Sequence, residues 1–139
     1  MAQTIQDVMT PEPVTLPVTA KLPEAAAAMR DDAIGNVIVM RDGEVCGIVT
    51  DRDIVVRAVA HGKDVRSIAL SDICSKELTA LSPADTVEHA VELMREHAFR
   101  RLPVVDHGRP VGIVSIGDLA QERDPGSALA EISAAAPNR

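Results

Sequence analysis

The sequence predicts an α+β fold made of two pseudo-symmetric β-α-β-β-α repeats. The first reason is a stretch that the chain contains twice: residues 47–54 read GIVTDRDI and residues 112–119 read GIVSIGDL. The second reason is that the offset between these stretches (112 − 47 = 65 residues) continues without a gap, so that Met29 falls on Met94 and Gly43 on Gly108. Two copies at so long a period indicate one duplicated unit rather than a solenoid.

The first copy begins with local patterns typical of a short helix, a short strand and a longer helix. Thr4 to Met9 reads as a helix or turn that Thr10-Pro11 ends. Val14-Thr15-Leu16 is predicted to be a strand. The longer helix follows because its apolar residues recur at the spacing of one helix face: Leu22, Ala25, Ala26 and Met29. Pro23 is compatible with this helix because it falls in the first turn.

A hairpin and a second helix complete the first copy. Val37 to Met40 and Val45 to Val49 read as two strands. The turn Arg41-Asp42-Gly43-Glu44 between them contains an Asp-Gly pair, which supplies the positive φ that a tight hairpin requires. Thr50 opens the second helix, which is predicted to run to about Ala60.

The second copy repeats this order after a polar linker at residues 61–64. A strand near Leu78 to Leu81, a helix from Thr86, a hairpin over 102–113 and a helix from Ser115 are predicted. These elements set the expected domain boundaries: residues 5–61 are the first repeat, residues 70–123 the second, and residues 124–139 a C-terminal tail with a short helix at about Ser127 to Ala135.

Composition limits the classes of function that this chain can have. At 139 residues the chain is long enough for one domain that buries about two-thirds of its unfolded surface. Phe99 is the one aromatic residue and the net charge is −7, so base stacking and clustered phosphate contacts are both disfavoured and we expect no nucleic-acid partner. Without a membrane-length apolar run or a secretory pattern after Met1, we expect a cytoplasmic protein with no membrane partner.

Two hydroxyl–carboxylate pairs stand between an apolar strand and a helix: Thr50 with Asp53, and Ser115 with Asp118. Such pairs form a capping box, in which each side chain bonds a backbone N–H of the other residue. The same geometry can hold a nucleotide, because a helix N-terminus and a hydroxyl bind phosphate and a carboxylate accepts hydrogen bonds from ribose hydroxyls. The two interpretations are compatible, although spacing alone favours the cap.

Arg100 and Arg101 immediately precede the strand that starts at Leu102. A charge pair in this position is usually a solvated strand edge. Beside a phosphate site it would contribute more, because a guanidinium matches phosphate oxygens bidentately. The first copy has the uncharged Gly35 and Asn36 at the equivalent positions, so we expect two chemically unequal sites.

Residues 5–121 resemble a tandem pair of CBS domains, also called a Bateman module. The resemblance rests on the duplicated unit and on its motifs, which are RRLPVVD at 100–106, GIVS at 112–115 with Asp118, and GIVTDRD at 47–53. The run from Thr50 to Ile54 is similar to small stand-alone bacterial CBS-pair proteins, including the hypoxic-response type. The resemblance implies that the two repeats pack as a CBS-domain pair with ligand clefts between them.

The resemblance also implies a class of ligand and the residues that hold it. CBS pairs bind adenosine-containing molecules, here AMP, ADP or ATP, with NAD or S-adenosylmethionine as further options; AMP or ATP is favoured, and no cofactor is required. The positions carried over are the hydroxyls, the carboxylates and the phosphate side of both copies: Asn36, Thr50, Asp53, Arg100, Arg101, Ser115 and Asp118. Because clefts in this family draw on both repeats, either arginine could instead serve the neighbouring site.

The expected function is therefore a regulatory ligand-sensing module. It would signal to an unidentified protein partner in trans, and by resemblance it would form a homodimer through its helices. The alternative is an interaction or structural protein with unoccupied clefts, which could respond to stress or redox conditions. No catalytic arrangement is visible in the sequence, so an enzyme is the least favoured class.

The cysteines and histidines predict no metal site. The four histidines lack the H-E-x-x-H spacing of a helical zinc site. Cys46 and Cys74 occupy non-equivalent places in the two copies and suggest no disulfide framework. Cys46 is expected to be a small core residue, whereas Cys74, near a loop, could be a reactive thiol.

Overall fold

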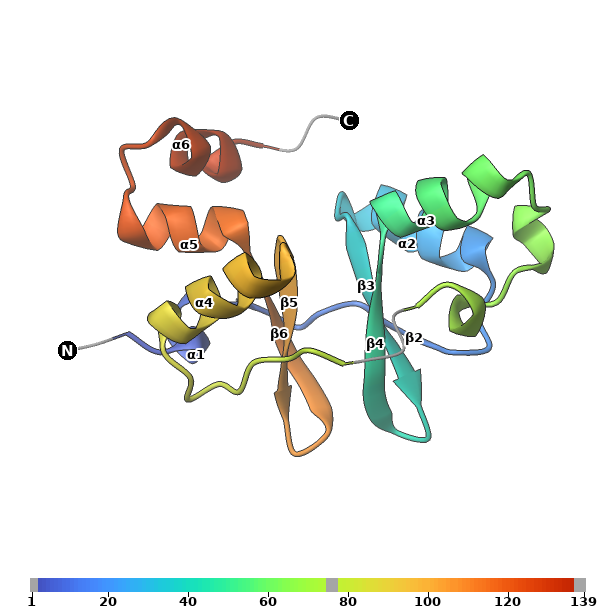
Figure 1. Ribbon diagram of the computed structural model, residues 1–139, viewed down its shortest axis with the longest axis horizontal. Helices are drawn as coiled ribbons and strands as arrows, with labels where there is room; N and C mark the ends of the chain where they lie inside the picture. Colours follow the sequence, from blue (N-terminus) through green and yellow to red (C-terminus); the bar gives the residue numbers. More distant parts are fainter. Residues whose placement is uncertain (1–2, 75–77, 137–139) are drawn as a thin grey trace. The chain divides into compact units, whose positions relative to one another are not determined.

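The computed structural model describes residues 3–74 and 78–136 of the chain. These residues form two compact units, each containing a three-stranded sheet (Figure 1). We call Val14–Leu78 the first-copy unit, and Met1–Pro13 together with Thr79–Arg139 the second-copy unit. Each unit has its own aliphatic core, as expected for a chain with almost no aromatic residues.

The first-copy unit is a three-stranded sheet with two helices. Its sheet has the order β2-β3-β4, with β2 parallel to β3 and β3 antiparallel to β4. The strands and helices are β2 (Thr15–Pro17), α2 (Leu22–Asp32), β3 (Asn36–Arg41), β4 (Glu44–Thr50) and α3 (Asp51–Arg57), followed by 3-10 turns at Val59–His61, Val65–Ser67 and Leu70–Asp72. The second helix, predicted to run to about Ala60, therefore ends at Arg57 and is followed by the 3-10 turn Val59–His61.

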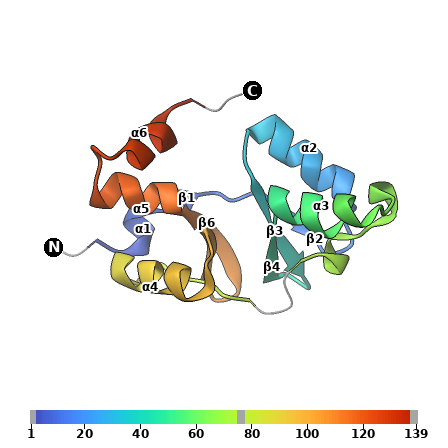
Figure 2. The same cartoon turned by 45° about the horizontal axis from the view of Figure 1, so that its top comes forward.

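The second-copy unit has the sheet order β1-β6-β5, with both pairings antiparallel. Its elements are α1 (Ile5–Val8), β1 (Thr10–Pro11), α4 (Val87–His97), β5 (Arg101–Asp106), β6 (Arg109–Ser115), α5 (Ile116–Arg123) and α6 (Ala128–Ala134). Helices α4 and α5 lie on the same side of the β5–β6 hairpin, with α1 near α5, and α6 folds back along α5 (Figure 2).

The two units repeat each other at the 65-residue offset in strand register as well as in sequence. Asn36 lies opposite Thr50 in one hairpin, and Arg101 lies opposite Ser115 in the other. Met29 and Met94 are both buried, each 8% exposed. These observations confirm the predicted duplication. The strand expected near Leu78 to Leu81 is wrong in extent, because only Leu81 forms a bridge, parallel to Val104 of β5.

Local predictions hold where a short pattern dictates the backbone. Asp42 and Gly43 have φ values of 52° and 81°, as a tight hairpin with two left-handed residues requires. In α2, Leu22, Ala25 and Met29 are buried as predicted, but Ala26 is exposed, so the buried face is narrower than its apolar pattern indicates.

The N-terminal segment packs in the unit of the other copy. The sequence places Thr4 to Met9 at the start of the first repeat, but Ile5 is buried with Leu81 and Leu102 in the second-copy core. Its equivalent Leu70 is buried in the first-copy core. Isolated antiparallel bridges fix both segments: Thr4 pairs with Thr86 in the second-copy unit, and Ala69 pairs with Lys21 in the first-copy unit.

Candidate functional site

The second-copy candidate site forms where β6 ends and α5 begins. The Ser115 hydroxyl accepts a hydrogen bond from the Asp118 backbone N–H at 3.1 Å, and the Ser115 N–H donates to Asp118 Oδ2 at 2.9 Å. The Ile116 N–H donates to the Arg100 carbonyl at 2.9 Å. The backbone next to Arg101 is thereby fixed beside the first turn of α5.

The first-copy candidate site has the same construction at the start of α3. The Thr50 hydroxyl accepts from the Asp53 N–H at 3.1 Å, and the Thr50 N–H donates to Asp53 Oδ2 at 2.8 Å. The Asp51 N–H donates to the Gly35 carbonyl at 3.0 Å, and Asn36 pairs with Thr50 across the hairpin. Both predicted capping boxes are therefore present, and within each unit the predicted site residues are brought together.

The remaining carboxylate oxygens of the two sites face different surroundings. Asp53 Oδ1 lies 3.7 Å from Arg57 Nε, and Arg57 also donates from Nη1 to the Ile73 carbonyl at 3.1 Å. Asp118 instead lines a small polar cavity of about 220 Å³ with Asp7 and Glu122 among its neighbours. Because carboxylates accept hydrogen bonds from hydroxyls and repel phosphate, this cavity suits a sugar better than an anion.

The two helix starts also differ in what covers them. Gly117, in the first turn of α5, is buried, and a Cβ there would come within 2.8 Å of the Ser133 Cβ on α6. A glycine is therefore what lets α6 approach the start of α5. The equivalent residue in α3 is Arg52, which is exposed and carries a positive charge into a helix first turn.

A comparison with family models decides which family these paired motifs represent. The model of the CBS domain matches the chain twice, over residues 5–59 and 70–124. The chain belongs to the CBS-domain family. CBS domain-containing protein YhcV of Bacillus subtilis is 38% identical over 133 residues, which cover 93% of this chain and 94% of YhcV. Hypoxic response protein 1 of Mycobacterium tuberculosis is 32% identical over 101 residues, covering 72% of this chain and 71% of that protein.

Solved CBS structures share this architecture. The CBS domain pair of protein MJ0100, solved with 5′-methylthioadenosine and S-adenosyl-L-methionine, superposes with a TM-score of 0.82 at 23% identity, covering 91% of this chain and 100% of that chain. At this identity the likeness concerns the fold alone. CBS-pair proteins are regulatory, ligand-binding modules, and membership of the family places this chain among them.

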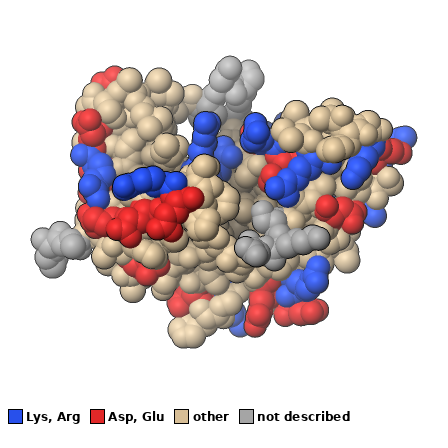
Figure 3. Space-filling model, in the orientation of Figure 1, with Lys and Arg blue, Asp and Glu red and all other residues tan. Residues whose placement is uncertain are grey.

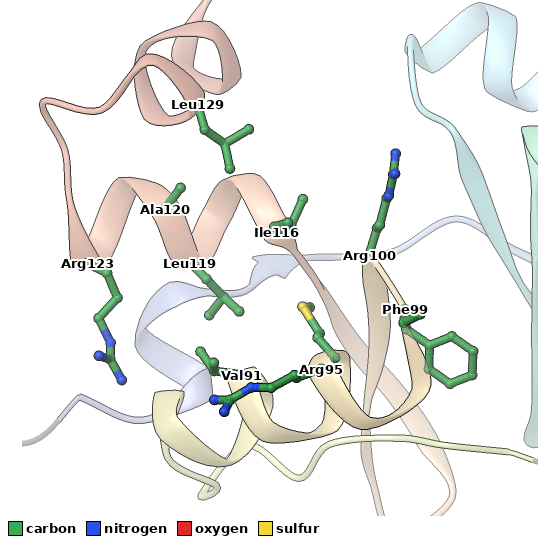
Figure 4. A pocket seen from close by; sticks show the side chains of 11 residues that line it. Val91, Arg95, Phe99, Arg100, Ile116, Leu119, Ala120, Arg123 and Leu129 are labelled. Atoms are coloured by element: carbon green, nitrogen blue, oxygen red, sulfur yellow. The ribbon is translucent and has the colours of Figure 1, made fainter.

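The second-copy unit of this CBS pair also carries an apolar groove of about 530 Å³ between α4, α5 and α6 (Figure 4). Val91 of α4 and Leu119 of α5 point toward each other in the groove, and Leu129 of α6 points toward α5. Arg100 extends from the start of β5 away from Arg95 and Arg123, so it is placed differently from the other two arginines that line the groove.

Sequence reasoning missed three residues of this CBS pair that bear on its candidate sites. Gly117 and Ser133 bring α6 over one helix start, and Arg52 stands at the other. Two signals were available: a glycine in the first turn of a helix indicates close backbone approach, and a cation there opposes the helix dipole. Nothing in the sequence pointed to Ser133.

Two further findings concern the described part of the chain. Within residues 3–74 and 78–136, no group of three or more His, Cys, Asp or Glu side chains is placed to hold a metal ion. None of the helices in the same ranges is long and apolar enough to cross a membrane.

Proposed function

We propose that this CBS pair senses adenosine-containing nucleotides, AMP or ATP before the others, and signals their presence to a protein partner in trans. The observation that carries the proposal is the matched construction of the two helix starts. Each unit places a hydroxyl, a carboxylate and the start of the neighbouring strand around one helix N-terminus. The complex of MJ0100 with adenosine-containing ligands supports this choice of chemistry.

The proposed roles follow from the chemistry of each group. The N–H groups of Asp53 and Asp118 already donate to the Thr50 and Ser115 hydroxyls, and those of Asp51 and Ile116 donate to backbone carbonyls. The Thr50 and Ser115 hydroxyls accept in these caps, and their own O–H groups would donate to phosphate oxygens near the positive end of the helix dipole. Asp53 and Asp118 would accept hydrogen bonds from the ribose hydroxyls. Arg100 or Arg101 would pair with phosphate in the second-copy site. In the first-copy site, Asn36 can offer only a neutral amide.

The proposal assigns the chain a regulatory role without catalysis and a cytoplasmic location. It includes no nucleic-acid partner. On the face shown in Figure 3, acidic and basic side chains are interspersed, and those over α4 lie side by side. Such a mixed surface does not offer the clustered positive charge that phosphate backbones require.

A ligand screen by thermal denaturation tests the proposal. AMP, ADP, ATP, NAD and S-adenosylmethionine are each added to the protein, with adenine-free ribose 5-phosphate as the control. A ligand at 100 times its Kd should stabilise the fold by about 2.7 kcal/mol, which raises the unfolding temperature measurably. If none of the five raises it at millimolar concentration, the sensing role is wrong and the interaction-protein alternative is favoured.

We also propose that the protein is a homodimer. The apolar faces of α2 and α4 are used inside the two unit cores and are not free for a partner. Apolar side chains are exposed elsewhere: Val55 of α3 is 57% exposed, and Val59, in the 3-10 turn that follows α3, is 54% exposed. The equivalent of Val55 in α5 is Ala120, which lines the groove beneath α6. The α3 face thus lacks the cover that its counterpart has.

Light scattering of a charge variant tests this interface. The wild type should have twice the mass of one chain at micromolar concentration, and Val59→Glu should have the mass of one chain, because a carboxylate buried in an apolar interface is strongly unfavourable. Ser71→Glu adds the same charge at an exposed position of the same unit and should remain dimeric. A monomeric wild type would refute the proposal.

A further inference from the structure

The two cysteines of the chain lie in the same unit, and the fold brings them together. In the β3–β4 hairpin, Val39 pairs with Gly47 and Met40 with Val45, so Cys46 is the extra residue of a β-bulge. A bulge re-aims the side chain of its extra residue. Cys46 is half-buried against the first-copy core.

Cys74 is held against the same core by its backbone. Its N–H donates to the Leu70 carbonyl at 2.9 Å. The preceding residue, Ile73, is buried, and its carbonyl accepts the bond from Arg57. Cys74 is likewise half-buried and packs against the same core cluster as Cys46, and the Cys46 thiol lies close enough to contribute to the raised pKa of the Cys74 thiol.

The other unit shows that this contact is built into the fold. At the 65-residue offset, Cys74 corresponds to Met9 and Cys46 to Val111. Val111 is the extra residue of the same bulge in β6, because Val104 pairs with Gly112 and Val105 with Pro110. A Cβ at Gly112 would come within 2.9 Å of Met9 Cγ, so Met9 packs on this bulge. Where one unit has Met and Val, the other has two cysteines.

We propose that Cys46 and Cys74 form a reversible thiol–disulfide pair that ties the segment after Leu70–Asp72 to β4. The oxidant is a low-molecular-weight disulfide. One cysteine thiolate attacks a sulfur of that disulfide, its S–S bond breaks, and one thiolate leaves. The second cysteine thiolate then attacks the mixed disulfide and expels the other. The protein loses two protons and two electrons, and the small disulfide becomes two thiols.

The surroundings of the pair set the pH dependence of this exchange. Burial raises the pKa of the Cys74 thiol above its ordinary value, the Cys46 thiol adds to the rise, and Arg41 of β3 opposes it. The attacking species is the thiolate, so the exchange is slow at neutral pH and becomes faster as the pH rises. The proposal is independent of nucleotide binding, and its test uses no nucleotide.

The test exposes the reduced protein to oxidised glutathione across a pH series. Free thiols are titrated after denaturation, intact mass is measured, and a peptide map locates any bond. The expected product has lost both free thiols, contains a bond between Cys46 and Cys74, and retains no glutathione. Its thermal midpoint should be about 10 °C above that of the reduced protein, since a disulfide restrains the unfolded chain.

The chain offers a matched control for this experiment. The double variant Cys46→Val with Cys74→Met copies the pair of the other unit, so it should fold and melt at the same temperature with and without oxidant. Cys46→Ser and Cys74→Ser should each retain one glutathione, because the resolving thiol is absent. The proposal is overturned if the wild type keeps glutathione on both cysteines or forms covalent dimers. It is also overturned if the wild type retains both free thiols at a pH of about 8.5, the ordinary pKa of cysteine.

Discussion

Replacing Ile5 by Ala should lower the free energy of unfolding of the second-copy unit by about 2–5 kcal/mol, the range measured for truncating large buried aliphatic residues. Ile5 is 0% exposed and belongs to the core cluster that contains Leu81 and Leu102. Truncation removes buried methyl groups and leaves a cavity that this aliphatic core can only partly close. The loss should occur in the second-copy unit, although Ile5 precedes the first copy in the sequence.

Hydrogen exchange followed by mass spectrometry locates the effect of Ile5→Ala. Amides of β5 and β6 should lose protection, while those of β3 and β4 keep theirs. Leu70→Ala is the reciprocal variant, because Leu70 is the equivalent residue and is buried in the first-copy core. Ile132→Ala, at a side chain 72% exposed, should change stability by no more than about 0.5 kcal/mol. If Ile5→Ala lost amide protection only in β3 and β4, this would contradict the observed packing of Ile5 in the second-copy core.

The elements of the fold could be predicted where short-range chemistry determines them. The Asp42-Gly43 turn needs two left-handed residues, and the capping boxes need only four consecutive residues each. Because of the 65-residue repeat, an element predicted in one copy could be checked against the equivalent residues of the other copy. The candidate hydroxyls and carboxylates were predictable for the same reason, since each pair is adjacent along the chain.

The placement of the N-terminal segment could not be predicted, because it depends on a choice between two similar cores. Ile5 and Leu70 are both aliphatic, occupy equivalent positions, and follow equivalent residues in the repeat. Either could fill either core as far as size and polarity are concerned. Nothing in the local sequence near Thr4 or Ala69 says which of Thr86 and Lys21 it will bridge.

The features that distinguish the two candidate sites escaped prediction for a related reason. The contact between Arg57 and the Ile73 carbonyl joins residues far apart in the chain. It depends on where the segment around Leu70 packs. The approach of Ser133 to Gly117 depends on the direction in which α6 returns along α5. These contacts make the sites unequal, beyond the difference between Asn36 and the two arginines.

The inequality of the sites has a direct consequence for ligand binding. If the arginines serve the second-copy site, a charged hydrogen bond of roughly 1.5–3 kcal/mol replaces a neutral one of roughly 0.5–1.5 kcal/mol. This difference predicts about tenfold tighter binding of a phosphorylated ligand at Ser115 and Asp118 than at Thr50 and Asp53. Arg52 acts in the opposite direction, because its exposed guanidinium at the start of α3 could reach a phosphate there.

Calorimetry with AMP on Asp118→Ala and Asp53→Ala resolves these opposing contributions. We expect Asp118→Ala to weaken the tighter binding event by roughly 10- to 150-fold, the equivalent of losing a charged hydrogen bond of about 1.5–3 kcal/mol to the ribose. Asp53→Ala should leave that event unchanged. Each variant loses a capping bond of nearly equal length, 2.9 Å and 2.8 Å, and Asp53→Ala also loses the 3.7 Å contact with the partly exposed Arg57. Similar thermal midpoints of the two variants would show that binding and not folding has changed. If Asp53→Ala removes the tighter event and Asp118→Ala spares it, the stronger site lies at α3, and Arg52 rather than Arg100 or Arg101 becomes the phosphate ligand to replace next.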